Sequence, residues 1–591
     1  MAEKGRYTKF SNKIGLFSNS KGSFVKNDTS VVLNFPFKDA VLEGGMSKEE
    51  VGREERFLHL ELDSKDIDTL EEPKVLTDFR YVDEDGEKAL TASSDIEFFD
   101  ADGNLKQNLL IKGNNLLALY TLRERLAGQV KLIYIDPPYN TGNDGFRYND
   151  SFNHSAWLSF MKNRLEVACE LLADDGSIFI SIDNNEVAYL QVLADEVFGK
   201  QNRKNTITVK RGSVTGAKVI NPGLVNVTEF VLIYTKNSDS WKPNRLLRKK
   251  SRDDRYGTYI ANIEDHYSKW RFIPLLEAFA NSLGVSKSEL KKTLQEEFET
   301  KLGEFILDDP RRVIRFASLD EKSISKKAVE LKKESVQNPG VTFYMEREGK
   351  RPYYVHNGNI ILFATDRLSN IDGEMTFSEP LSDIWDDVLP NDLHNEGGVE
   401  FRKGKKPEKL IQRLIGLCSD EGDIVLDYHL GSGTTAAVAH KMNRRWIGIE
   451  QMDYIADVTS KRLAKVLAGD QGGISKAVGW DGGGSFVYLE LKKYNQEYID
   501  RIMEATSLSE LEDLYVDMRN NAFLKFWFDR HAFEKDEDFR KLDLDGRKEA
   551  LADVLDENQL YLNYADMDDT RHKVTADEKT LTDKFYGSNK N

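Results

Sequence analysis

The sequence has 591 residues, more than one hydrophobic core usually supports, so two to four domains are expected. Apolar residues make up 40% and charged residues 31%, a composition that excludes a disordered or membrane-embedded chain. No apolar run is long enough to span a bilayer and no signal peptide is recognisable, so we expect a cytoplasmic protein without a membrane partner. Two cysteines exclude a disulfide framework, and the nine histidines show no metal-ligand spacing, so no metal site is expected.

The charge is unevenly distributed along the chain. A net charge of -17 argues against a protein that coats nucleic acid indiscriminately, because its mean field would repel phosphate. Lysine and arginine are nevertheless concentrated in residues 201–255 and again in 401–410, whereas residues 500–591 are acidic. The overall acidity therefore hides a basic middle region where a phosphate backbone could bind.

Alternating helix and strand patterns begin near residue 105. Residues 1–95 mix short apolar pieces with acidic loops and suggest only an N-terminal structural or oligomerisation region. Beyond them, hydrophobic periodicity predicts helices and apolar strands in turn. The predicted order is helix 115–126, strand 130–135, helix 155–172, turn and strand 174–183, and helix 186–199. Such alternation is typical of a parallel α/β sheet.

This alternation stops near residue 200 and returns at "KPEKLIQRLIGLC", residues 406–418. The segment between is irregular, basic and aromatic, and the tail from about 485 is predicted to be helical, charged and separate. We expect one sheet interrupted by an inserted module, because each half alone would leave exposed edges. The expected divisions are 1–95, 96–200 (first half of the sheet), 201–395 (inserted module), 396–484 (second half) and 485–591.

"VLDYHLGSGTTAAVAHKM" predicts a strand at 424–426, a tight turn at Gly431 and Gly433, and a helix from about Thr434. Such a turn lets the backbone approach a ligand closely. It lacks the lysine of a Walker A loop and is shorter than the dinucleotide fingerprint, so a purely structural turn remains an alternative. Glu450 closes the next strand about 20 residues later, where α/β nucleotide sites hold a ribose.

The strand at 130–135 runs directly into Asp136-Pro137-Pro138-Tyr139. The carboxyl edge of a parallel sheet is where ligand crevices lie. Prolines fix the backbone and offer carbonyl oxygens without amide donors. A carboxylate and carbonyl acceptors suit an exocyclic amino group, whose nitrogen becomes more nucleophilic when both hydrogens are held. An adjacent tyrosine ring offers a stacking face for a planar base.

"DPPYNTG" followed downstream by "GSGTT" resembles the S-adenosylmethionine-dependent DNA amino-methyltransferases in their β arrangement. With "VVLNFPFKDAVLEGG", "FISIDNNE" and "DYHLGSGTTA", the chain is similar to the modification subunit of Type III restriction-modification systems from about residue 30 to 465. This resemblance implies a Rossmann-like methyltransferase sheet with a target-recognition module at 201–395. It also implies methyl transfer from S-adenosylmethionine to adenine N6 in double-stranded DNA, with the base flipped out.

The resemblance also implies a role for each matching residue. Asp136 and the Pro137 carbonyl would hold the adenine amino group, Pro138 completes the catalytic tetrapeptide, and Tyr139 would stack on the base. The implied cofactor-binding residues are Asp427, His429, Gly431, Ser432, Gly433, Thr434, Glu450, Lys406, Pro407 and Asn114. The usual phenylalanine of the glycine loop is absent, and Tyr428-His429-Leu430 stands in its place.

In the family, the modification subunit dimerises and binds a restriction subunit with helicase and nuclease activities. This chain has no P-loop lysine motif, so DNA cleavage is not expected of it. Two alternatives remain: an orphan methyltransferase without a nuclease partner, and a DNA-binding assembly protein that has lost catalysis. The intact DPPY, GSG turn and Glu450 weigh against the latter. Asp136, where related enzymes carry serine, favours adenine over cytosine.

Overall fold

The computed structural model divides into two compact units, residues 1–244 with 383–591, and residues 245–382. It describes residues 7–9, 16–18, 23–25, 33, 35, 71–141, 154–212, 223–321, 324–371, 374–389, 393, 396–401, 404–525, 528, 530–555 and 560–588. Within these ranges, no helix combines the length and apolar character needed to cross a bilayer.

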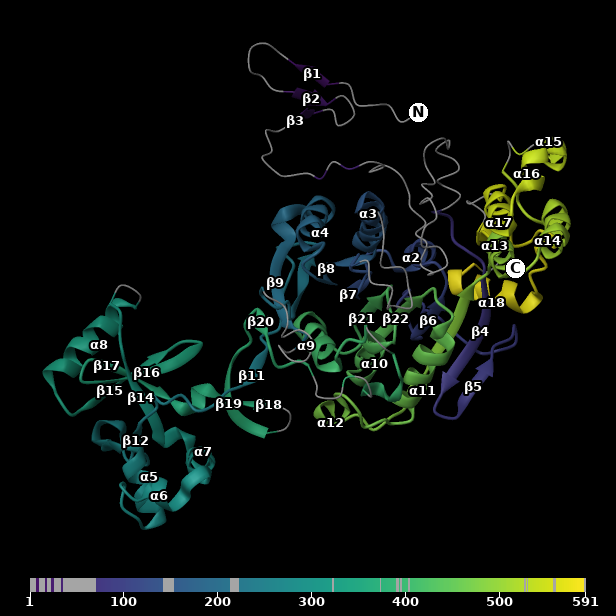
Figure 1. Ribbon diagram of the computed structural model, residues 1–591. Coiled ribbons are helices and arrows are strands. Elements are labelled where there is room, and N and C mark those ends of the chain that lie inside the picture. The colour runs from purple at the N-terminus through teal and green to yellow at the C-terminus, as the bar shows by residue number, and fades with distance from the viewer. Residues whose placement is uncertain are drawn as a thin grey trace. The chain divides into compact units, whose positions relative to one another are not determined.

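An eleven-stranded sheet forms the centre of the first unit (Figure 1). From edge to edge its strands are β20 (Ile384–Trp385), β9 (Arg203–Lys210), β10 (Thr228–Thr235), β8 (Leu172–Ile182), β7 (Val130–Ile135), β21 (Ile424–Asp427), β22 (Arg445–Glu450), β6 (Leu109–Lys112), β23 (Phe486–Leu491), β4 (Leu76–Asp83) and β5 (Gly86–Ala89). The six strands from β8 to β23 are mutually parallel, and the flanking pairs β10–β8, β10–β9, β23–β4 and β4–β5 are antiparallel.

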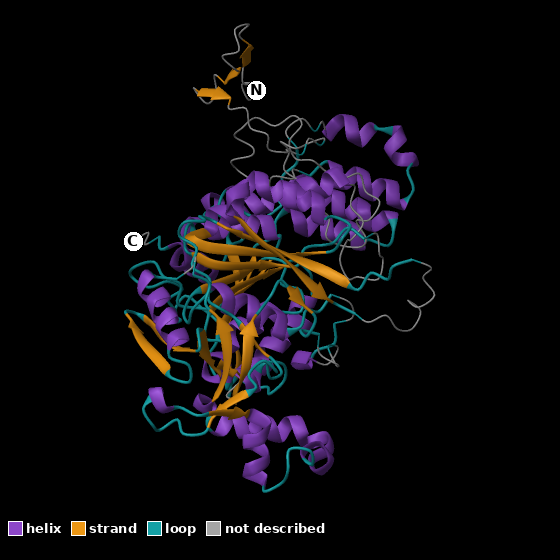
Figure 2. Ribbon diagram, turned by 90° about the vertical axis from the view of Figure 1, so that its left-hand side faces the viewer, coloured by secondary structure: helices purple, strands orange, loops and turns teal. Residues whose placement is uncertain are grey.

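The parallel core is apolar on both faces because helices cover both (Figure 2). Strand β7, "VKLIYI", is buried at five of its six positions. One layer contains α2 (Asn115–Leu126), α3 (His154–Leu171) and α4 (Val187–Ala194), and the other contains α9 (Glu408–Cys418), α10 (Thr434–Lys441) and α11 (Lys461–Leu467). The predicted α/β fold is confirmed.

Strands from the two predicted halves alternate in the centre of the sheet. β7 from the first half pairs with β21 from the second, and β6 lies between β22 and β23. Each half would therefore expose unpaired parallel edges without the other. This pairing explains why the helix-strand pattern stops and then resumes in the sequence.

The second unit, residues 245–382, has its own sheets and core. A six-stranded antiparallel sheet has the order β13 (Phe272–Pro274), β12 (Thr258–Ile260), β14 (Val313–Ser318), β17 (Asn359–Phe363), β16 (Lys350–His356) and β15 (Thr342–Arg347). A smaller sheet has the order β11 (Leu247–Lys249), β19 (Glu374–Pro380) and β18 (Leu368–Ile371). The helices include α5 (Leu275–Leu283), α7 (Phe298–Asp308) and α8 (Lys326–Gln337), and α5 and α7 contribute Phe279, Leu302 and Ile306 to the core.

Three boundaries differ from the sequence-based divisions. Strands β9 and β10 extend the main sheet by antiparallel pairing, so the separate unit is shorter than the expected module at 201–395. Strands β4 and β5 belong to the sheet edge and not to a separate region at 1–95, most of which lies outside the described residues. Strand β23 inserts the start of the tail into the same sheet, and α18 (Ala576–Tyr586) packs on β4, so the tail is not separate.

Candidate active site

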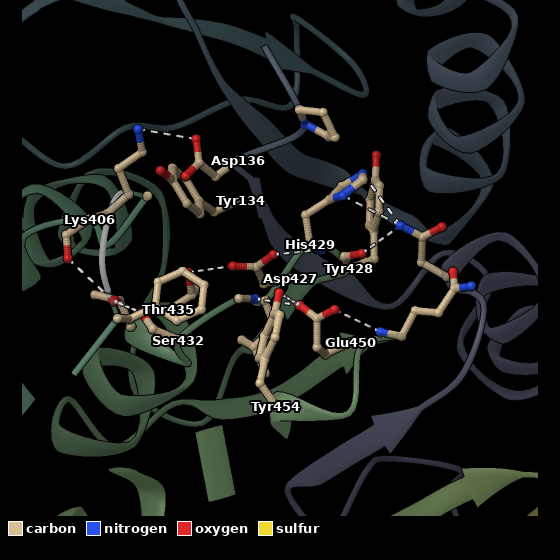
Figure 3. A pocket seen from close by; sticks show the side chains of 18 residues that line it. Tyr134, Asp136, Lys406, Asp427, Tyr428, His429, Ser432, Thr435, Glu450 and Tyr454 are labelled. Atoms are coloured by element: carbon tan, nitrogen blue, oxygen red, sulfur yellow. Dashed lines mark hydrogen bonds and ion pairs between the residues drawn. The ribbon is translucent and has the colours of Figure 1, made fainter. Parts of the chain in front are cut away.

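Three adjacent parallel strands end in acidic residues at the same edge of the sheet. β7 is followed by Asp136, β21 ends at Asp427 and β22 ends at Glu450. The pairings Leu132 with Val425 in β7–β21, and Asp427 with Gly448 in β21–β22, bring these ends together. The DPPY segment and the glycine turn, almost 300 residues apart in sequence, therefore meet at one crevice (Figure 3).

This crevice contains a first cavity that combines backbone turns with aromatic and acidic side chains. Its lining residues are Asn115, Tyr134, Asp136, Pro138, Phe401, Gly404, Lys406, Asp427, Tyr428, His429, Leu430, Gly431, Ser432, Thr434, Thr435, Glu450, Gln451 and Tyr454. The Tyr454 ring meets Phe401 edge to face, with 5.2 Å between ring centroids. Of the described residues, Gln451 contributes a buried side-chain oxygen without a hydrogen-bond partner.

Glu450 ties the glycine turn to the end of β22. Its Oε2 accepts from the Gly431 amide at 2.9 Å and from the Tyr454 hydroxyl at 3.0 Å. Its Oε1 accepts from the amides of Gln451 and Met452. Gly431 and Gly433 have φ of 54° and 81°, a left-handed conformation that favours glycine. A Cβ at Gly433 would also lie 2.9 Å from Thr459 Cγ2.

Asp427 is 3% exposed and lies at the centre of the cavity wall. Its carboxylate accepts from the Thr435 hydroxyl at 2.6 Å and from the His429 amide at 2.9 Å. Burial is the main cause that raises the pKa of Asp427 to about 7, with a further contribution from the Asp136 and Glu450 carboxylates and an opposing one from these two hydrogen bonds. Burial also lowers the pKa of His429 to about 3, so its imidazole is neutral at physiological pH. The cavity therefore favours a ligand that brings positive charge to Asp427.

A hydrogen bond from helix α3 holds the backbone of the DPPY segment in place. The indole Nε1 of Trp157, a fully buried residue of α3, donates to the Pro138 carbonyl at 2.8 Å. Within the described chain no hydrogen bond engages the Pro137 carbonyl. One proline carbonyl is thus used to fix the segment, and the other remains able to accept from a ligand.

A second cavity of about 570 Å³ adjoins the first. Its lining residues are Asp136, Tyr139, Thr141, Asp183, Asn184, Asn185, Val209, Lys210, Arg211, Asn226, Glu229, Val388, Leu389, Leu393, Gly404, Lys405, Lys406 and Pro407. Asp136, Gly404 and Lys406 border both cavities. A group held at Asp136 can therefore face a ligand in either one.

The side chain of Lys406 is directed at Asp136. Its Nζ lies 3.1 Å from Asp136 Oδ1 and 2.9 Å from Glu229 Oε2, and it donates to the Tyr139 hydroxyl at 2.6 Å. Burial raises the pKa of Asp136, Lys406 opposes this effect, and Glu229 adds to it. Burial alone would lower the pKa of Lys406, but Asp136 and Glu229 outweigh it and raise that pKa. Lys406 is therefore a buried cation.

Beneath the glycine turn lies a fully buried ionic network. Glu408 Oε1 accepts from Arg462 Nη2, and Oε2 accepts from Lys441 Nζ, each at 2.8 Å. Burial would raise the pKa of Glu408, but the two cations overcome this effect and hold it below its ordinary value. Arg462 Nη1 also donates to the Thr434 hydroxyl at 2.7 Å, and that hydroxyl donates to the Lys406 carbonyl. The network thus connects the glycine turn to the segment that carries Lys406.

Seven of the ten residues predicted to bind a cofactor line the first cavity: Lys406, Asp427, His429, Gly431, Ser432, Thr434 and Glu450. Gly433 instead shapes the turn, and Pro407 lines the second cavity. Asn114 caps α2 through its side-chain oxygen, and its neighbour Asn115 lines the first cavity.

Of the DPPY residues, Asp136 borders both cavities, Pro138 lines the first and Tyr139 the second, whereas Pro137 lines neither. No sequence motif marks Glu229, Gln451 or Tyr454 as a site residue. An acid inside the apolar strand "TEFVLIYT" was a usable signal for Glu229.

Replacing Glu408 by Gln should lower the free energy of unfolding by about 3–5 kcal/mol, because two buried cations lose their counter-charge. Urea unfolding followed by circular dichroism measures this loss. The exposed Glu421 provides the matched control, and Glu421→Gln should change stability by less than about 0.5 kcal/mol. Equal stability of the two variants would contradict the role given to the network.

Replacing Asp427 by Asn should flatten the pH dependence of stability in the ligand-free protein. A carboxyl whose pKa is raised in the folded state stabilises the fold at low pH, and this stabilisation is lost as pH rises toward about 7. In the wild type, Asp427 should lower the free energy of unfolding by about 3 kcal/mol between pH 5 and pH 8. The variant lacks this carboxyl, so it should not show this decrease. Thermal unfolding at both pH values tests this, with the exposed Asp457→Asn as control; parallel wild-type and D427N profiles would refute it.

Comparisons with known proteins agree with this geometry. Residues 130–461 match the family N6_N4_Mtase, described as DNA methylase. The protein named probable type III restriction-modification enzyme HindVI Mod subunit, from Haemophilus influenzae, is 36% identical over 99% of this chain and 88% of its own length. The EcoP15I Mod subunit of Escherichia coli is 30% identical over 61% of this chain and 60% of its own length. The chain belongs to the DNA methylases and, among them, to the Mod subunits of type III restriction-modification enzymes.

Proposed function

We propose that this DNA methyltransferase transfers a methyl group from S-adenosylmethionine to N6 of an adenine flipped out of double-stranded DNA. The observation that supports this most directly is the position of Asp136 on the wall shared by the two cavities. The first cavity would hold the cofactor and the second the extruded base. Asp136 would then hold the amino group at the boundary between methyl donor and acceptor.

The donor set of the first cavity fits this cofactor. The buried Asp427 carboxylate suits its cationic group, and the Gly431 turn leaves space for close backbone approach. Glu450 already accepts four hydrogen bonds, so it would exchange one of them, such as that from Tyr454, for a cofactor hydroxyl. The orphaned oxygen of Gln451 can accept from an adenine amino group. When bound, S-adenosylmethionine supplies a methyl group on a positively charged sulfur. The raised pKa of Asp427 supports this assignment, because a cationic ligand would stabilise its ionised form.

The chain's own residues would act on the amino group of the base. Asp136 and the Pro137 carbonyl accept its two hydrogens and direct the nitrogen lone pair toward the first cavity. The Trp157–Pro138 hydrogen bond keeps these acceptors in place. Tyr139 lines the second cavity, where its ring can stack on the base. Aspartate at this position favours adenine as the target.

The rim of the second cavity suits a nucleotide leaving a duplex. Lys210 and Arg211 are basic, and Asn184, Asn185 and Asn226 offer amide groups. Basic side chains position a phosphate backbone without reading its sequence. Lys405, by contrast, is buried and donates to the carbonyls of Glu396 and Val399, so this part of the second basic run is structural. The separate unit at 245–382 is the candidate for target recognition.

The relatives are named as subunits of restriction-modification enzymes. We therefore infer that the chain works with a restriction subunit and marks DNA that this partner would otherwise cut. A homodimer is part of the proposal, since a duplex offers two strands to recognise. An orphan methyltransferase would show the same methylation without such a partner, and co-purification with a helicase-nuclease subunit separates the two cases.

Replacing Asp136 by Ala should abolish methylation while leaving cofactor affinity within about tenfold, because the carboxylate acts on the base. The assay uses labelled S-adenosylmethionine with unmethylated plasmid DNA, and mass spectrometry of the nucleosides identifies the methylated base. The exposed Asp85→Ala is the control and should retain wild-type activity. Loss of cofactor binding in D136A would assign Asp136 to the cofactor instead, and product on cytosine would refute adenine as the target.

Replacing Tyr139 by Ala should weaken capture of the extruded base by about 1–3 kcal/mol, because a stacking face is lost. Tyr139→Phe keeps the ring and removes only the hydroxyl, so it should retain most of this capture. A fluorescent base analogue at the target position reports extrusion in both variants, once methylation-sensitive sequencing has given the recognition site. Equal capture by wild type and Y139A would contradict the stacking role.

A further inference from the structure

The Lys406 ammonium group contacts three side chains at the same time. Asp136, Glu229 and Tyr139 all lie within 3.1 Å of Nζ. Nζ donates hydrogen bonds to Glu229 and Tyr139 and forms an ion pair with Asp136. Its side chain is 12% exposed, and that of Glu229 is 6% exposed. The arrangement is therefore a largely buried cluster of two carboxylates, one cation and one phenol, in which Glu229 is the most enclosed member.

This cluster conflicts with the binding of a base. The carboxylate that would hold the target amino group is already 3.1 Å from Lys406 Nζ. An ammonium group carries a full positive charge, so it is attracted to a carboxylate more strongly than a neutral N–H donor is. A neutral amino group must therefore compete with a stronger ligand for Asp136.

Glu229 offers a way to resolve this competition. It lies on β10, in the antiparallel part of the sheet, and faces the second cavity. A buried cation that loses its only anionic partner costs several kcal/mol, but Lys406 would keep Glu229 at 2.9 Å. Tyr139 would remain a second acceptor for the ammonium group.

We propose that Glu229 is a positioning residue that retains the Lys406 ammonium group while Asp136 exchanges it for the amino group of the target base. Lys406 then occupies Asp136 and neutralises its charge until the base binds. This inference rests on the proposed function, because it requires a base amino group at Asp136. It assigns to β10 a role in target capture.

The charges around Asp136 determine what each substitution should do. The groups that face it are Lys406, Glu229 and Asp427, together with the phenols of Tyr134 and Tyr139. Glu229→Gln removes an anion and leaves Asp136 as the only anionic partner of Lys406. Lys406→Met removes the competing cation, so the Asp136 carboxyl then lies between acids and phenols alone.

The first test compares Glu229→Gln with wild type in methylation of unmethylated plasmid DNA. We expect kcat/KM for DNA to fall at least tenfold in E229Q, with the dissociation constant for S-adenosylmethionine within twofold of wild type. The acidic limb of the kcat/KM profile should move to lower pH in E229Q and to higher pH in K406M. A role limited to folding would move neither limb.

The double variant tests whether Glu229 acts through Lys406. Glu229→Gln introduced into K406M should change kcat/KM by less than twofold, because no ammonium group remains to be retained. The same tenfold loss in both backgrounds would overturn the proposal, as would an E229Q single variant with wild-type kcat/KM and an unmoved acidic limb. Glu166→Gln, on the exposed face of α3, is the matched control.

Wild-type activity separates this inference from the proposed function. Absence of adenine methylation by the wild type would refute the function itself. Adenine methylation by the wild type, with E229Q and K406M indistinguishable from it, would refute only the role of Glu229.

Discussion

The buried carboxylate of Glu408 connects the elements around the glycine turn. It lies at the start of α9 and binds Lys441 of α10 and Arg462 of α11, and all three side chains are fully buried. Ions removed from water are tolerated only when their partners are complete, so the three helices have little freedom to shift relative to one another. Because Arg462 also contacts Thr434, this constraint extends to the glycine turn and, through the Lys406 carbonyl, to the edge of the second cavity.

The site formed on this support is rich in acids. Asp136, Glu229, Asp427 and Glu450 face the two cavities, and Lys406 is the cation in contact with two of them. Such a balance is unsuited to a phosphorylated cofactor, whose charge would be repelled. It suits a cationic cofactor on one side and a neutral amino group on the other. The electrostatics therefore agree with amino-group methylation, and three of these four acids lie outside the DPPY motif.

The sequence allowed good prediction where structure is set locally. Strand β7, the glycine turn and Glu450 were located because an apolar run followed by turn residues is a local pattern, and parallel strands place such ends at one edge. The direction of Lys406 could not be predicted, because its partners Asp136 and Glu229 come from distant strands. Of the neighbouring Asn114 and Asn115, the first caps α2 and the second lines the cavity, a difference that the sequence does not reveal because a helix cap and a cavity-lining residue look alike in it.

Strand pairing was the largest source of error in the divisions. β9 and β10 appear in the sequence as the beginning of an irregular basic region, and β23 as the beginning of a helical tail. Their place in the sheet depends on neighbours hundreds of residues away, which periodicity does not reveal. The place of Glu229 in the site likewise depends on which strands lie beside β10, and the sequence does not show these neighbours.

The position of β6 has a consequence for synthesis on the ribosome. This strand is made early, at residues 109–112, yet its two neighbours in the sheet are β22 and β23, which end at residues 450 and 491. Chains fold domain by domain as they emerge, and long-range parallel pairing is slow. Nascent chains therefore carry a half-finished sheet, with β6 unpaired on both sides and β7 unpaired on the side of β21, while all residues of the compact unit at 245–382 have already been made. The parallel core of the sheet can therefore be completed only after residue 491 has been synthesised.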